Sequence, residues 1–246
     1  MTALQGKVAI VTGSSRGIGA AIAVSLAQEG ANVVVNYVSP SSKARAEEVA
    51  KTIERFGSKA LVVQADVANL DDLDNLVKQT VDAFGKIDIL VNNSGVIELA
   101  AIGEITPESY CSMFNINVRA IIFLSQAAVP HMGKGGRIIN VSSTLARMGY
   151  PTSIVYSASK GAVESLTRVM GIELRDKEIR VNSVAPGPTT TDMFYQNSEE
   201  QREAIKAHFP VGEPSDIADA VVFLASPASR WVTGTTLSVN NGMVLV

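Results

Sequence analysis

The sequence predicts an α/β fold, a doubly wound parallel sheet of about seven strands with helices on both faces. Three observations predict it. Short β-branched runs alternate with helical patterns along the chain, several of these runs are apolar at nearly every position, and the first run leads into a glycine-rich turn. Strands that are apolar throughout are typical of parallel sheets covered on both faces. Regular alternation of strand and helix favours right-handed crossovers within one sheet.

The expected strands share a short length and a β-branched composition. They are Val8–Val11, Val33–Tyr37, Leu61–Ala65, Ile87–Val91, Arg137–Val141, Arg180–Val184 and Thr236–Val239. A (β/α)8 barrel also fits the length of 246 residues. We favour the open sheet, because the strands fall short of eight and because a barrel does not need a glycine-rich first turn.

Glycines mark the ends of three expected helices. Gly30, Gly57 and Gly85 each fall just before a strand. The residue that follows a helix commonly takes a positive φ, which glycine adopts without strain. Asn69, followed by Asp71, predicts the start of the third helix, because its side-chain oxygen can accept a free backbone N–H.

No linker, repeat or low-complexity stretch divides the chain, so residues 1–246 are expected to form one domain. The longest irregular stretch runs from Pro186 to Pro210. Because a loop of that length in a compact domain is usually functional, we expect residues 186–210 to form a substrate loop that closes as a lid.

The composition excludes several functional classes. The net charge is −3 and no cluster of Lys and Arg stands out, so no nucleic-acid partner is expected. One cysteine and two histidines are too few for a His/Cys metal cluster, so no metal site is predicted. The mean hydropathy is +0.20, yet no apolar run reaches about 18 residues. The N-terminus does not resemble a signal peptide, so we expect a cytoplasmic protein without a membrane partner.

The glycine-rich turn Thr12–Gly19 predicts a site for a dinucleotide pyrophosphate. Its glycines let the backbone approach the phosphates, and the following helix offers free N–H groups. The alternative is a tight turn without a ligand. The second strand ends at Asn36 and Tyr37, without the acid that NAD-preferring sites place on the ribose. Arg16 in the turn, with Lys43 nearby, would suit a 2′-phosphate, so NADP is favoured over NAD.

Polar residues follow two more strands at the same expected edge of the sheet. Asp66, with Val67 after it, follows the third strand. Asp66 could accept a hydrogen bond from an adenine amine, or it could only cap a turn. The cluster Asn92-Asn93-Ser94-Gly95 follows the fourth strand. Because ligands of open α/β sheets bind at the carboxyl ends of the strands, this cluster is placed for close approach of a cofactor.

Tyr156 and Lys160 stand at i and i+4 and would share one face of a helix. A phenol titrates at about 10, and a neighbouring ammonium would lower this pKa towards neutrality, helped by the charge of an oxidised nicotinamide. Ser143 follows the fifth strand and can hold a substrate oxygen beside the tyrosine. Asn117 lies in an apolar helix, where its amide could kink the helix, bind a water or be satisfied within the core. For the other three residues the alternative is a surface or turn position.

Together these motifs closely resemble the short-chain dehydrogenase/reductase family, in its order and at its spacings over almost the whole chain. The matching segments are Thr12–Gly19, Asn92–Gly95, Asn117, Ser143, Tyr156 with Lys160, Pro186-Gly187, and Thr233-Gly234 with Val239-Asn240-Asn241-Gly242. The resemblance implies a Rossmann-type domain that binds a nicotinamide cofactor. It also implies a dimer or tetramer, paired through the helices that carry Asn117 and Tyr156.

The resemblance further implies roles for individual residues. Tyr156 would donate or accept the proton, and Lys160 would lower its pKa and hold the nicotinamide ribose. Ser143 would orient the carbonyl group, Asn117 would keep a proton-relay water, and Thr191 would contact the nicotinamide carboxamide. The implied catalytic set is Asn117, Ser143, Tyr156 and Lys160. The implied cofactor contacts are Gly13, Ser15, Arg16, Gly17, Ile18, Gly19, Asn36, Tyr37, Asp66, Val67, Asn93, Ser94, Gly95, Tyr156, Lys160, Pro186, Gly187, Thr189, Thr191 and Met193.

The implied activity is an NADP(H)-dependent oxidoreductase that transfers a hydride between nicotinamide and a ketone or secondary alcohol. The expected pocket wall is largely apolar and aromatic, which suits a hydrophobic or cyclic carbonyl compound. Its members are Leu145, Met148, Tyr150, Met193, Phe194, Tyr195 and Phe209. Ser94, which stands where the family more often has alanine, and the run from Ala185 to Phe194 are similar to those of polyketide naphthol reductases.

Other activities stay open. A 3-oxoacyl-carrier-protein reductase would need a basic rim near the site to dock its acidic carrier. Scattered candidates for such a rim are Lys134, Arg175, Lys177 and Arg180. A sugar or polyol dehydrogenase would need more polar groups in the pocket, and a non-catalytic NADP-binding redox sensor would have no need of the catalytic set. Arg147 could pair an acidic substrate, although a solvated surface position is favoured.

Overall fold

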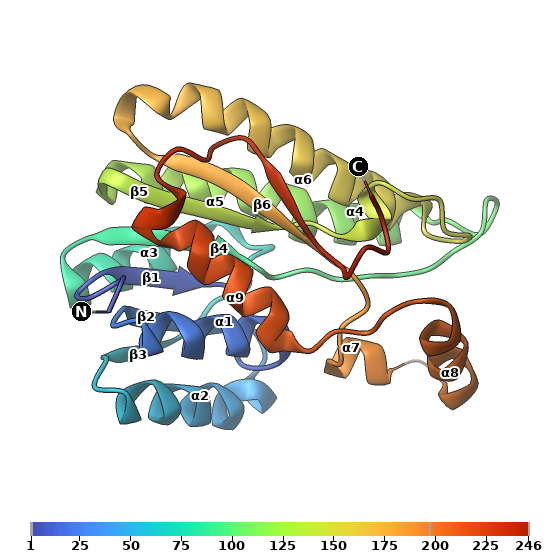
Figure 1. The fold of residues 1–246 in the computed structure, drawn as a ribbon, viewed down its shortest axis with the longest axis horizontal. Coiled ribbons are helices and arrows are strands. Elements are labelled where there is room, and N and C mark those ends of the chain that lie inside the picture. The colour runs from blue at the N-terminus through green and yellow to red at the C-terminus, as the bar shows by residue number, and fades with distance from the viewer. Residues whose placement is uncertain (1, 197, 246) are drawn as a thin grey trace.

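Seven parallel strands form one open sheet in the computed structural model, which describes residues 2–196 and 198–245. The order across the sheet is β3-β2-β1-β4-β5-β6-β7 (Figure 1). The bounds are β1 Val8–Val11, β2 Asn32–Tyr37, β3 Ala60–Gln64, β4 Ile87–Asn92, β5 Met132–Val141, β6 Arg180–Pro186 and β7 Thr236–Val239. The predicted doubly wound, Rossmann-type sheet is therefore confirmed, and the barrel is excluded because β3 and β7 are sheet edges.

Helices cover both faces of this sheet. One face carries α1 (Gly17–Gln28), α2 (Lys43–Arg55) and α9 (Pro214–Ala225), and the other carries α3 (Leu70–Phe84), α4 (Pro107–Phe114), α5 (Ala120–Ala128) and α6 (Ile154–Glu173). The strand residues divide between the two sides. Val33 and Val35 pack with α1 in one cluster, whereas Val34 between them packs with α3 in the other. This division explains why the strands are apolar without alternation.

The predicted helix ends are confirmed. Gly30, Gly57 and Gly85 have φ values of +91°, +81° and +78°, in the left-handed region that favours glycine. The Asn69 side chain caps α3 by accepting the N–H of Asp71 at 3.0 Å. These helix ends determine where the strands that follow them, β2, β3 and β4, begin.

The helical run Pro107–His131 joins α4, a π-helical turn at Asn115–Arg119, and α5. By length and composition alone this run is apolar enough to cross a membrane, a test that the core helix of an α/β domain also passes. Its residues Ala120 and Leu124 pack into the core beneath the sheet. The run is therefore placed as a core helix of an α/β domain.

The segment that follows β6 is more regular than the sequence predicts. Between Pro186 and Pro210 lie two helices, α7 (Asp192–Tyr195) and α8 (Glu199–His208). Figure 1 shows both beyond the carboxyl ends of the strands. Ser198 and Gln201 form a capping box at the start of α8, and α8 buries none of its residues. The expectation of one long irregular loop is corrected: two short helices lie beyond the carboxyl edge of the sheet.

Candidate active site

The glycine-rich turn is held in place by β2. The Asn36 Oδ1 accepts the Gly13 N–H at 3.0 Å, and the Asn36 N–H donates to the Ser14 hydroxyl at 3.1 Å. A side-chain carbon at Gly19 would lie 2.5 Å from the Gly13 carbonyl oxygen, so no larger residue fits there. The turn therefore brings the carboxyl ends of β1 and β2 together and leads directly into α1.

Asn36 and Tyr37 were expected at the cofactor, and the structure gives them a different environment. Their exposed fractions are 1% and 6%. The Asn36 amide also donates to the carbonyl oxygen of Ala65 at 3.0 Å, so this side chain is engaged on both its oxygen and its nitrogen. Asn36 holds the turn and the end of β3, whereas Arg16 in the same turn is exposed.

The turns after β3 and β4 are also fixed by side chains. The Asp66 Oδ1 accepts the Ala68 N–H at 2.9 Å, which realises its turn-capping alternative, and Val67 is buried. The Thr12 hydroxyl accepts the N–H groups of Asn93 and Ser94 at 3.0 Å each. The cluster after β4 is thus attached to the end of β1, beside the glycine-rich turn.

The start of α1 has the properties of an anion site. Its N-cap residue, Arg16, makes no side-chain hydrogen bond to the first turn. Free N–H groups and the positive end of the helix dipole favour a negative group at this position. The structure thus places the Gly17-Ile18-Gly19 backbone where a phosphate would meet it.

Ser143, Tyr156 and Lys160 meet at the carboxyl end of β5. The Ser143 hydroxyl accepts the Leu145 N–H at 3.2 Å and lowers the pKa of the neighbouring Tyr156 phenol. Lys160 is 3% exposed, its Nζ donates to the Val141 carbonyl oxygen at 2.8 Å, and the same Nζ lies 5.8 Å from the centre of the Tyr156 ring. The predicted spacing on α6 is therefore realised, and the cation lies beside the aromatic ring.

The pKa directions differ from the sequence-based expectation. Desolvation raises the pKa of the Tyr156 phenol above its ordinary value, and the Ser143 hydrogen bond offsets part of this rise. Desolvation also lowers the pKa of Lys160 to about 8. The protein groups alone therefore keep the phenol protonated at neutral pH, and the expected lowering by Lys160 is not found in them.

Asn117 lies in the π-helical turn between α4 and α5 and is fully buried. Its Oδ1 accepts the Val96 N–H at 2.9 Å, and its Nδ2 donates to the Val96 carbonyl oxygen at 2.9 Å and to the Ser159 hydroxyl at 3.0 Å. A side-chain carbon at Gly95 would lie 3.3 Å from Lys160 Nζ and 3.4 Å from Asn117 Oδ1. Asn117 thus joins the segment after β4 to α6, next to Lys160, and the local helix is distorted as one alternative expected.

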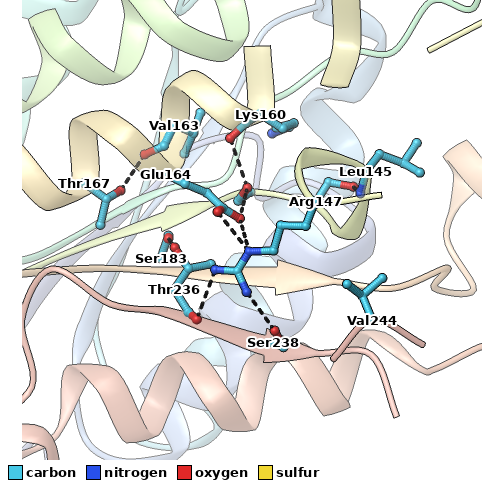
Figure 2. A network of polar contacts seen from close by, with 12 residues as sticks. Leu145, Arg147, Lys160, Val163, Glu164, Thr167, Ser183, Thr236, Ser238 and Val244 are labelled. Carbon is cyan, nitrogen blue, oxygen red and sulfur yellow. Dashed lines mark hydrogen bonds and ion pairs between the residues drawn. The ribbon is translucent and has the colours of Figure 1, made fainter. Parts of the chain in front are cut away.

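A largely buried ion pair between Arg147 and Glu164 lies next to Ser142 and Lys160. Figure 2 shows the Arg147 guanidinium reaching across to Glu164 on α6 and to the edge of β7. Arg147 Nε lies 2.9 and 3.0 Å from the two Glu164 carboxylate oxygens, and Nη1 donates to the Ser238 hydroxyl at 3.1 Å. The Ser142 hydroxyl lies 3.2 Å from both Glu164 Oε1 and the Lys160 carbonyl oxygen. Arg147 is neither a solvated surface residue nor free for an acidic substrate, which corrects both expectations.

The segment after β6 returns to the glycine-rich turn. Gly187 N–H donates to the Val239 carbonyl oxygen at 3.1 Å, and Thr189 is buried. Thr191 caps α7 by accepting the Phe194 N–H, and its methyl group would lie 3.3 Å from a side-chain carbon at Gly17. The next residue, Asp192, forms ion pairs with Arg16 and with Arg45 of α2. Met193 is exposed beside them.

Four charged residues were missed by the sequence reasoning: Arg45, Arg147 as an internal partner, Glu164 and Asp192. A signal existed for Glu164, which stands four residues after Lys160 and so shares the helical face of Lys160 and Tyr156. The pairs of Arg147 and Asp192 join segments far apart in sequence, and no local pattern predicts them.

Comparisons with known proteins agree with this geometry. A family model described as "Enoyl-(Acyl carrier protein) reductase" matches residues 13–244. A versicolorin reductase of Emericella nidulans is 42% identical, over 97% of this chain and 96% of that protein. The crystal structure of a short chain dehydrogenase from Burkholderia cenocepacia in complex with NADP is similar with a TM-score of 0.93 and 40% identity, over 98% of this chain and 99% of that one. The angucycline C-6 ketoreductase LanV with bound NADP has a TM-score of 0.94 and 40% identity, over 99% and 98% of the two chains.

Proposed function

The chain belongs to the short-chain dehydrogenase/reductase family, and on that premise we propose that it is an NADP(H)-dependent reductase of hydrophobic or cyclic ketones. The observation that carries the proposal is the meeting of Ser143, Tyr156 and Lys160 at the carboxyl edge of the sheet. The whole chain, residues 1–246, acts as one unit in this proposal, and residues 186–210 border its substrate side.

The residues present fit a nicotinamide dinucleotide phosphate. The close backbone approach at Gly19 and the free N-terminus of α1 suit the pyrophosphate. The exposed guanidinium of Arg16 suits a 2′-phosphate, and no acid ends β2. The solved relatives that hold NADP support this choice. The bound cofactor supplies the hydride.

Tyr156 is the proton donor in this mechanism. Its raised pKa keeps the phenol protonated at neutral pH, which is the form that a reduction consumes. As the carbonyl oxygen gains negative charge, Tyr156 gives it the proton while the Ser143 hydroxyl donates a hydrogen bond to the same oxygen. The buried ammonium of Lys160, held by the Val141 carbonyl, stabilises the phenolate that remains.

Asn117 has a positioning role in the same mechanism. By holding both main-chain polar groups of Val96 and the Ser159 hydroxyl, it fixes the turn after β4 against the helix that carries Tyr156. It also borders Lys160 across Gly95, where the family resemblance places a proton-relay water.

Exposed apolar side chains on the segment that follows β5 and on α7 support a hydrophobic substrate. Tyr150 follows the Ser143 turn, and Met193 and Tyr195 lie on α7; their exposed fractions are 41%, 42% and 58%. Relatives named as a versicolorin reductase and an angucycline ketoreductase support a cyclic ketone. We therefore expect turnover with fused-ring ketones.

A 3-oxoacyl-carrier-protein reductase is the second candidate, and the description of the matching family model favours keeping it. The basic rim expected for it is poorly placed. Lys134 and Arg180 lie at the amino ends of β5 and β6, opposite the edge that carries Tyr156, and Lys134 is paired with Glu178 at 2.7 Å. A carrier would have to be docked by other charges.

The test follows the absorbance of NADPH with a panel of a fused-ring ketone, a β-ketoacyl thioester and a keto sugar, with NADH in parallel. Turnover of the fused-ring ketone with NADPH is the expected result. Faster turnover of the thioester would select the second candidate. Tight NADPH binding without turnover of any compound would favour the redox sensor and overturn the proposal.

We also propose a homo-oligomer located in the cytoplasm. Ile122 and Phe123 on α5, and Val169 and Ile172 on α6, are exposed apolar residues on the helices that the family resemblance pairs. Light scattering of the wild type and of the Ile172→Glu variant tests the assembly, and a monomeric wild type would refute it. Cell fractionation tests the location.

A further inference from the structure

Two arginines from different elements converge on one carboxylate. Arg16 Nη1, at the glycine-rich turn, lies 3.0 Å from Asp192 Oδ2, and Arg45 Nη1, on α2, lies 2.7 Å from the same oxygen. Within residues 2–196 and 198–245, Asp192 is the one acid within ion-pair distance of either guanidinium. The structure therefore contains an assembled anion site whose occupant is a side chain of the chain itself.

The two arginines share one carboxylate oxygen as their partner. Each would otherwise face the charge of the other across a short distance, since both contact one oxygen atom. The side chains of Arg16, Arg45 and Asp192 are 53%, 57% and 45% exposed. Exposed ion pairs contribute little net stability, so a stronger anion from solution can replace the carboxylate.

The start of α7 lies on the glycine-rich turn at the same place. Gly17 has a φ of +56°, and a side-chain carbon there would lie 3.3 Å from the Thr191 methyl group. Thr191 is the N-cap of α7, and Asp192 is its first residue. The ion pairs of Asp192 therefore join the start of α7 to the turn, and their loss would remove two of the contacts that place this end of the segment.

We propose that Asp192 occupies the place of the cofactor 2′-phosphate and is displaced by it, with Arg45 as a second phosphate ligand beside Arg16. This inference rests on the NADP(H) dependence proposed above. A phosphate dianion offers three oxygens, so each guanidinium can bind its own oxygen instead of sharing one. The displaced Asp192 carboxylate is then repelled by the phosphate. NADH has no 2′-phosphate and leaves the bridge intact, so the choice of cofactor is coupled to the position of α7.

The first experiment measures the dissociation constants of NADPH, NADH, 2′,5′-ADP and 5′-AMP by calorimetry. Asp192→Asn is expected to tighten NADPH and 2′,5′-ADP roughly 3- to 10-fold, because it removes the competing charge, and to leave NADH and 5′-AMP unchanged. Arg45→Gln is expected to weaken the two phosphorylated ligands by about 10-fold. Controls of the same net charge are Glu200→Gln on α8 and Lys51→Gln on α2, whose side chains lie outside the cluster.

The second experiment measures hydrogen exchange of the α7 amides. Binding of 2′,5′-ADP is expected to speed their exchange, 5′-AMP is expected to leave it unchanged, and ligand-free Asp192→Asn is expected to resemble the wild type with 2′,5′-ADP. These probes carry no nicotinamide, so contacts of α7 with the reactive ring do not enter the result.

The outcomes separate the two proposals. If the wild type binds NADPH and 2′,5′-ADP no better than NADH and 5′-AMP, the proposed NADP dependence fails. If the wild type prefers NADPH but Asp192→Asn binds it equally or more weakly, only the displacement of Asp192 fails. If Arg45→Gln binds NADPH as the Lys51→Gln control does, Arg45 is not a phosphate ligand.

Discussion

The Arg147 guanidinium and the Glu164 carboxylate form an ion pair, with Arg147 Nε 2.9 and 3.0 Å from the two carboxylate oxygens. The side chains are 18% and 9% exposed. Glu164 also accepts from Ser142, the neighbour of Ser143, and lies one turn beyond Lys160 on α6. The pair thus connects the turn that carries Ser143 to the helix that carries Tyr156 and Lys160.

Arg147→Met is expected to destabilise the protein by about 3 kcal/mol, because it leaves a buried carboxylate without its partner. Urea unfolding measures the change. The double variant Arg147→Met/Glu164→Leu should recover much of the loss, since no charge is then left unpaired. Arg175→Met, which removes an exposed pair with Asp176, is the control and should change stability by about 0.5 kcal/mol or less. A single variant as stable as this control would contradict the role of the pair.

Tyr156→Phe is expected to lower kcat roughly 10²- to 10⁴-fold, because the phenol supplies the proton. The dissociation constant of NADPH should change little, since the ring is retained beside Lys160. Stopped-flow turnover and fluorescence titration measure the two quantities. Tyr110→Phe, at an exposed tyrosine on α4, is the matched control. Normal turnover in Tyr156→Phe would remove this residue from the mechanism.

Lys160→Met is expected to abolish activity and to stabilise the fold at neutral pH. Burial lowers the pKa of Lys160 to about 8 from 10.5, so the unfolded chain binds this proton more tightly than the folded one. The folded state is therefore penalised below pH 8, by about 3 kcal/mol, and the penalty fades as the pH rises from 8 towards 10.5.

The measurement for Lys160→Met is urea unfolding of the variant and the wild type across this range. The stability advantage of the variant should shrink by about 2 kcal/mol between about pH 7 and pH 10. Lys78→Met, at an exposed lysine paired with Asp82, should give a nearly constant difference. An equal pH dependence in the two variants would show that the Lys160 proton is not coupled to folding.

Asn36→Ala tests whether Asn36 holds the glycine-rich turn or contacts the cofactor phosphate. The substitution removes buried hydrogen bonds to Gly13 and Ala65 and should destabilise the protein by about 2 kcal/mol. Because the turn serves both cofactors, the affinities for NADPH and NADH should fall by similar factors. Calorimetry gives the ratio. A selective loss of NADPH affinity would show that Asn36 contacts the cofactor phosphate.

The sequence predicted the elements whose signals are local. The seven strands and the glycine helix ends were confirmed, because burial on both faces and positive φ each leave a mark on the residues themselves. Tyr156 and Lys160 were placed by helical spacing, and Ser143 by its position after a strand. The sequence also contains a local signal for α8, the capping box of Ser198 and Gln201. The prediction of one irregular loop did not take this signal into account.

The long-range charge pairs could not be predicted in the same way. Arg147 meets Glu164, and Asp192 meets Arg16 and Arg45, only after the sheet has ordered its strands. Asn36 illustrates the same limit: its position at the end of β2 was predicted, but the direction of its amide depends on turns contributed by β1 and β3. The partners of these polar side chains are brought close only by the tertiary fold.

The absence of buried residues in α8 has an evolutionary consequence. A helix that contributes nothing to the core can be rewritten by mutation, lengthened or exchanged without lowering the stability of the sheet that carries the reaction. Selection can then vary this helix while Ser143, Tyr156 and Lys160 stay constant. The part of the chain that can diversify is thus separate from the sheet and from α6, on which the arrangement of Tyr156 and Lys160 depends.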